Sequence, residues 1–164
     1  MASTISATYG LELSVVETFD GQVAPGDSTV TYDQLTENGI LTASSTVPAT
    51  KQASGTKLLS TGAGTLDMTA LPGKTADETV DATGLKCQLA IFHNLDANAN
   101  PITITFGAAN PYLLGGTGFS WILSPGDTLM VKRKDSAPDV AAGAKDIDLA
   151  GTGSQGLEYH LVFG

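Results

Sequence analysis

Apolar and polar residues alternate with a period of two in most patterned segments of this chain. Near the N-terminus every second residue is apolar: Ile5, Ala7, Tyr9, Leu11, Leu13 and Val15. Successive side chains of a β-strand point to opposite faces, so this alternation predicts half-buried strands. No long stretch has the 3.6-residue period of an amphipathic helix. The chain is therefore expected to be all-β, with little helix.

Short strands separated by turns are expected along most of the sequence. They lie at residues 5–15, 29–32, 39–42, 65–70, 89–93, 102–106, 119–123, 128–131, 147–149 and 157–163. Pro25-Gly26-Asp27 and Pro125-Gly126-Asp127 each precede a strand, and Pro followed by Gly suits the centre of a type II turn. Many short strands with turns between them predict an antiparallel β-sandwich, with a jelly roll as the expected topology.

Three segments depart from this pattern in a chain of 164 residues, which has the size of a single domain spanning 1–164. Residues 43–64 are small, polar and unpatterned, which predicts a long loop or a segment ordered only against a partner. Residues 1–15 are either a strand of the sheet or an extended arm that pairs with a neighbouring chain. Residues 76–83 are expected to form at most one short turn of helix.

The charge distribution argues against nucleic acid as a partner. The net charge is −9, and the first fifty residues contain no Lys or Arg. Binding to a phosphate backbone requires clustered basic side chains. The one basic cluster, Lys132-Arg133-Lys134, is expected to be the solvated end of a strand. The sequence has no apolar run of membrane-spanning length and no signal peptide, which predicts a soluble protein made in a cytoplasm, with no membrane partner.

Few residues suit catalysis or metal binding. His93 and His160 lie 67 positions apart, and the sequence shows no group of several His, Cys or carboxylate ligands at close spacing. Asp146 and Asp148 share one face of a strand, where they either bind Ca²⁺ together with backbone oxygens or simply form the polar face. No Gly-x-Ser-x-Gly motif is present. We therefore expect a protein that is not an enzyme, and we assign no catalytic residue, cofactor or metal ligand.

Two side chains are assigned to packing. Cys87 is the only cysteine, so an intrachain disulfide is impossible, and its phase in the strand predicts a buried residue. Trp121 is in phase with Phe119 and Leu123, which predicts a residue of the core or of an interface.

The half of the chain from Leu85 to Gly164 carries a series of strand and turn motifs. They are Ala90-Ile91-Phe92-His93-Asn94, Ile102-Thr103-Ile104-Thr105, Gly115-Gly116, Leu123-Ser124-Pro125-Gly126-Asp127-Thr128-Leu129 and Asp146-Ile147-Asp148-Leu149. This half resembles the cement or decoration proteins of tailed bacteriophages. The Pro-Gly-Asp turn also occurs in cupins, but the His-x-His pair of the cupin metal motif is absent here.

The resemblance implies a structural role. Cement and decoration proteins are compact β-rich modules, often jelly rolls, that commonly form trimers between capsomers. A member would be a virion protein, made in the host cytoplasm, that self-associates on the outer surface of a capsid, with a trimer favoured, and binds the major capsid protein. Scarce charge, at 15% of residues, also suits close-packed protein contacts. The alternative is a phage tail, fibre or cell-surface adhesin module that binds a receptor or a glycan.

Overall fold

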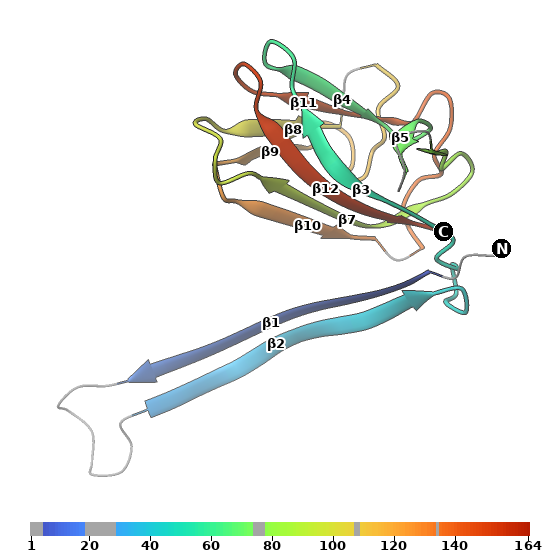
Figure 1. Ribbon diagram of the computed structural model, residues 1–164. Coiled ribbons are helices and arrows are strands. Elements are labelled where there is room, and N and C mark those ends of the chain that lie inside the picture. Colours follow the sequence, from blue (N-terminus) through green and yellow to red (C-terminus); the bar gives the residue numbers. More distant parts are fainter. Residues whose placement is uncertain (1–4, 19–28, 74–77, 107–108, 134) are drawn as a thin grey trace.

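The chain forms two four-stranded antiparallel sheets that face each other and a two-stranded arm that projects from them (Figure 1). This computed structural model describes residues 5–18, 29–73, 78–106, 109–133 and 135–164, and for residues 12–18 and 29–36 it describes the backbone only. All the regular elements in these ranges are strands. The prediction of an all-β antiparallel sandwich is confirmed.

The sandwich is built from two sheets of equal size. The first sheet contains, in spatial order, β10 (Thr128–Lys132), β7 (Cys87–Asn94), β12 (Gly156–Phe163) and β3 (Lys51–Leu58). The second sheet contains β4 (Ala63–Asp67), β11 (Asp146–Ala150), β8 (Ile102–Thr105) and β9 (Ser120–Leu123). A short pair, β5 (Leu71–Pro72) with β6 (Thr79–Val80), lies outside both sheets.

The core lies between the two sheets and is formed by alternate residues of their strands. Phe92 of β7 and Tyr159 of β12 are fully buried cross-strand neighbours in the first sheet. Ile104 of β8 and Ile147 of β11 are buried in the second sheet. Burying large apolar side chains on one face of each sheet provides the main driving force for folding. The period-two alternation in the sequence thus identified the inward face of these strands correctly.

The arm is a long antiparallel hairpin of β1 (Ser6–Thr18) and β2 (Thr29–Thr42). The extended N-terminal segment is therefore one strand of a two-stranded ribbon and not a strand of the sandwich. The strands expected at 29–32 and 39–42 are the two ends of the single strand β2. Leu13 pairs with Leu35 but Val15 pairs with Tyr32, so β2 carries an extra residue, a β-bulge, near the middle of the arm.

The expectation of a long loop, or of a segment ordered only against a partner, at residues 43–64 is wrong for residues 51–58 and 63–64. Residues 51–58 form β3, and Ala63 begins β4. Each residue of β3 pairs with one of β12, from Lys51 with Phe163 to Leu58 with Gly156, so a backbone ladder forms this strand although its side chains are small. The expected helical turn at 76–83 is wrong for Thr79–Val80, which form β6, while residues 76–77 lie outside the described residues.

The turn expected at Pro125-Gly126-Asp127 is present and leads into β10. The amide of Asp127 donates to the carbonyl oxygen of Ser124 at 2.9 Å, and Gly126 has a φ of 85°. A type II turn requires a positive φ at its third position, which favours glycine there. The second Pro-Gly-Asp motif, Pro25-Gly26-Asp27, lies outside the described residues.

Candidate functional site

Among the described side chains of the arm, those at its base contact the sandwich. Ile5, Ala7 and Tyr9 of the N-terminal segment and Leu41 of β2 pack on Ala49, Leu89, Val162 and Met130. The last three of these residues lie on the outer face of the first sheet. Figure 1 shows β1 and β2 running away from the sandwich beyond this contact. A small apolar cluster therefore holds one end of a long ribbon.

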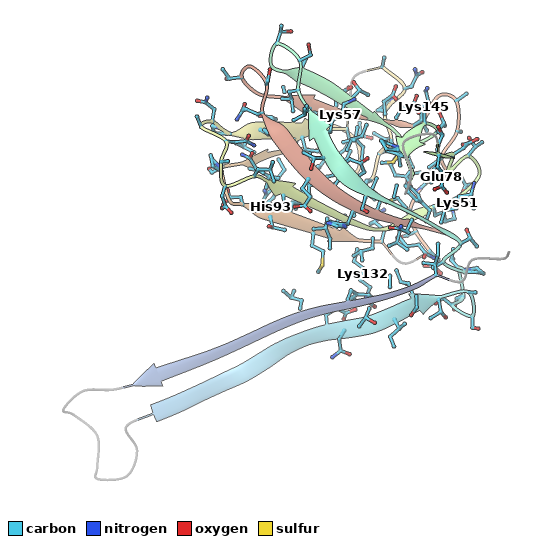
Figure 2. All side chains as sticks on the ribbon, in the orientation of Figure 1. Lys51, Lys57, Glu78, His93, Lys132 and Lys145 are labelled. Atoms are coloured by element: carbon cyan, nitrogen blue, oxygen red, sulfur yellow. The ribbon has the colours of Figure 1, made fainter. Side chains whose placement is uncertain are left out.

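Lys132, at the end of β10, makes the polar contacts at this junction. Its ammonium forms a salt bridge with Glu37 of β2 and lies 4.6 Å from the centre of the Tyr9 ring (Figure 2). Hydrogen bonds with Glu37 first, and with Tyr9 second, raise the pKa of Lys132 above its ordinary value. Lys132 is the end of a strand and partly exposed, as expected, but its ammonium is also paired with the arm, whereas Lys134 lies outside the described residues.

A cavity of about 400 Å³ lies beside this junction. Its walls include Tyr9 and Ile40 of the arm, together with Gln88 and Arg133 of the sandwich. The Gln88 side chain is buried, and its Nε2 donates to the Val47 carbonyl oxygen at 2.7 Å. Gln88 is the extra residue of a β-bulge, because Val162 pairs with Leu89 and Phe163 pairs with Cys87. The bulge turns the Gln88 side chain towards the base of the arm.

The large exposed apolar side chains lie on the arm and on edge strands. They are Leu11 and Ile40 on the arm, Leu58 on β3, and Trp121 and Ile122 on β9. Trp121 stacks on Phe119, with ring centres 6.2 Å apart and planes at 14°. Of the two environments expected for Trp121, the core is wrong, because β9 is at the rim of the sandwich, where the core face of the strand opens to solvent, whereas an interface stays a prediction.

The two histidines lie on the outer face of the first sheet and are neighbours across two strands. His93 of β7 pairs with Glu158 of β12, and His160 lies two residues further along. The Nδ1 of His93 is 3.0 Å from the Thr128 hydroxyl oxygen, and the Nε2 of His160 is 3.3 Å from the Glu158 carboxylate. Each ring thus has a local partner on the surface of the sheet.

Asp146 and Asp148 share one face of β11, as their spacing predicts. Asp148 accepts a hydrogen bond from the Thr65 hydroxyl at 3.0 Å. Burial first, and the neighbouring charge of Asp67 second, raise the pKa of Asp146 above its ordinary value. Asp67 itself forms a salt bridge with Lys145 at 2.5 Å. Within the described ranges, no three His, Cys, Asp or Glu side chains gather in a way that would hold a metal ion.

The Cys87 thiol is expected to be unreactive while the protein is folded. Cys87 is fully buried, as predicted, and burial raises the pKa of its thiol to about 12. The thiolate is the reactive form of cysteine. Burial therefore keeps reagents away from the sulfur and also lowers the fraction of the thiol that is ionised. A chromogenic disulfide reagent should label the thiol in guanidinium chloride and leave it unmodified in native buffer. Rapid labelling of the native protein would contradict this burial.

The described residues contain no helix that is long and apolar enough to span a membrane. Comparisons with protein-family models, with curated proteins and with solved structures find no match to this chain, so its function has to be argued from its own residues.

Proposed function

We propose that this chain is a structural virion protein, a capsid cement or decoration subunit that self-associates and stabilises a capsid lattice. The observation that carries the proposal is the arm, whose described side chains meet the sandwich at its base and whose strands run away from the sandwich beyond that contact (Figure 1). A two-stranded hairpin is at best marginally stable alone in water, and it gains stability from a third strand or a packed surface. A neighbouring subunit or the capsid surface would supply that support.

The topology of the sandwich is compatible with this role. We interpret it as a jelly roll, numbering its strands 1 to 8 from β3 to β12 and leaving out β5 and β6. The first sheet then has the order 6-3-8-1 and the second has the order 2-7-4-5. Jelly rolls occur in viral capsid proteins, in lectins and in cupins, so the topology supports the proposal without selecting it.

The charge distribution is also consistent with a place on the outer surface of a capsid. The net charge of −9 disfavours contact with packaged nucleic acid. The partners in this proposal are further copies of the chain, with a trimer as the favoured state, and the major capsid protein. The proposal assigns no catalytic step. It gives the histidines and acidic residues described above no role other than as polar residues on the surface of the sandwich.

Light scattering coupled to size exclusion tests self-association directly. We expect a trimer that persists on dilution. Hydrogen–deuterium exchange on the same samples should show slow exchange in β7 and β12 at every concentration, because these strands lie inside the first sheet. Amides of β1 and β2 should also exchange slowly in the trimer, because the arm then has a neighbour.

A strict monomer with equally fast arm exchange at all concentrations would contradict the self-association that we propose. Such a monomer would favour the alternative function, a tail, fibre or adhesin module. A screen against soluble glycans and receptor fragments would then follow.

A further inference from the structure

The outer edge of β9 is an open strand edge. β9 pairs with β8 on one side, from Ile102 with Leu123 to Thr105 with Ser120, and no other described strand pairs with it. Trp121 and Ile122 are 48% and 64% exposed. Open edges invite pairing with other chains, and proteins usually protect them with charges, prolines or bulges. Residues 120–123 contain none of these features.

We propose that β9 pairs with β9 of a second copy, antiparallel and about a two-fold axis, so that the second sheet continues from one copy into the other. This inference deepens the proposed function by naming one of the surfaces through which the chain associates with itself. An interface between identical patches closes on itself and does not grow into a filament.

Charge identifies the second copy as the occupant of this edge. The sandwich has four edge strands, β10, β3, β4 and β9. The first three carry charged residues: Lys132 on β10, Lys51 and Lys57 on β3, and Asp67 on β4. Charged side chains of this kind, lysines above all, are how proteins commonly protect strand edges against pairing. The edge strand β9 alone is uncharged, and it lies within residues 97–126, which contain no Asp, Glu, Lys or Arg.

The net charge of the whole chain also favours association at an uncharged edge. Two copies that each carry a net charge of −9 repel each other, and the repulsion is weakest where the facing surfaces are uncharged. The β9 edge combines such a surface with exposed apolar side chains and unpaired backbone groups. Association at this edge therefore adds apolar burial and hydrogen bonds at little electrostatic cost.

The faces of β9 restrict the register of the proposed pair. Trp121 pairs with buried Ile104 and is on the core face, whereas Ile122 pairs with Thr103 on the outer face. Residues directly opposite each other in a sheet share a face. With the axis at Ile122, the two Ile122 side chains meet and Trp121 opposes Leu123 of the second copy. With the axis at Trp121, Ile122 opposes Ser120, so the first register buries more apolar surface.

The size of the contact predicts its strength. Stable specific interfaces bury about 800 Å² per partner, and a four-residue strand with two exposed apolar side chains offers much less. We therefore expect weak pairing in dilute solution and extensive pairing at the high local concentration of a lattice. The test has to trap the pair covalently.

Ile122→Cys supplies such a trap. Cys87 is buried, so the introduced thiol is the accessible one in the folded protein. Directly opposed residues of an antiparallel pair have Cα atoms about 4.5–5.5 Å apart, which is within the roughly 4.4–6.8 Å that a disulfide spans. We expect a disulfide-linked dimer on mild oxidation, in several-fold higher yield than for Leu58→Cys. Leu58 is a matched control, since it is 67% exposed and also lies on an edge strand.

Equal yields from the two variants, or no dimer from Ile122→Cys, would overturn the proposal. Trp121→Cys completes the set, because a higher yield at this position would support the β9 edge but overturn the register at Ile122.

Ile122→Asp separates this contact from the proposed function. The substitution places two negative charges face to face, so association beyond the trimer in sedimentation at high protein concentration should be lost, while Leu58→Asp should retain it. An unchanged melting temperature would show that the sandwich is intact. If the trimer persists in Ile122→Asp, the proposed function is not contradicted. If Ile122→Cys forms the cross-linked dimer but the protein forms no trimer, the result supports pairing at β9 and contradicts the proposed trimer.

Discussion

Replacing Phe92 with alanine is expected to lower the free energy of unfolding by about 3–5 kcal/mol. Phe92 is fully buried on β7, between Leu129 of β10 and Tyr159 of β12 in the first sheet. Removing the ring loses its transfer free energy and leaves a cavity that neighbouring strands cannot close. Because domains of this size are stable by about 5–15 kcal/mol, the variant should be near the threshold of folding.

Urea denaturation followed by tryptophan fluorescence measures this loss. Ile91→Ala is the matched control, since Ile91 is the preceding residue of β7, is partly buried and faces outward. We expect the control to lose about 1–2 kcal/mol, given about 0.8 kcal/mol for each fully buried CH₂ group. Similar losses in both variants would mean that Phe92 does not lie in the core.

Replacing Asn94 with alanine is expected to cost about 2–4 kcal/mol, because buried polar groups would be left without partners. Asn94 is fully buried at the end of β7. Its Nδ2 donates to the carbonyl oxygen of Leu123 at 2.8 Å and to that of Asn100 at 3.3 Å, and its Oδ1 accepts from Asn98. Asn98 in turn bonds to both backbone groups of Gly156. Asn94 thus ties the 95–101 loop to β9 and β12.

Thermal and urea unfolding of Asn94→Ala measure this cost, with Asn100→Ala as the control. Asn100 takes part in the network through its backbone carbonyl group, which the alanine variant keeps. The control is expected to change stability by less than about 0.5 kcal/mol, as is usual at the surface. A loss in Asn100→Ala as large as that in Asn94→Ala would refute the assignment of the network to the Asn94 side chain.

The sequence predicted the strands whose side chains alternate and missed the strand whose side chains do not. Phe92 and Ile104 are in phase with their neighbours, and both are buried as that phase predicts. The strand β3 was not predicted, because its residues Gln52-Ala53-Ser54-Gly55-Thr56 show no apolar alternation. Its pairing with β12 depends on residues about one hundred positions away, which a local pattern cannot reveal.

The contacts of the arm and the exposure of the β9 edge were less predictable than the fold. The pairing of Lys132 with Glu37 joins residues far apart in the sequence, and nothing local marks either residue as a contact of the arm. The phase of Trp121 was correct, since it lies on the core face opposite Ile104. Its exposure depends on the position of β9 at the edge of the sheet, and strand order is a property of the whole chain.

The bulge in the arm affects any molecule that binds along its length. Two-stranded ribbons are strongly twisted, and a bulge adds to that twist locally. The register shift between Leu13 and Val15 divides the arm into a part next to the sandwich and a part beyond it, rotated relative to each other. A flat surface would therefore meet one of these parts and miss the other. A partner that follows the whole arm must itself be curved, so the arm selects its neighbours by shape as well as by chemistry.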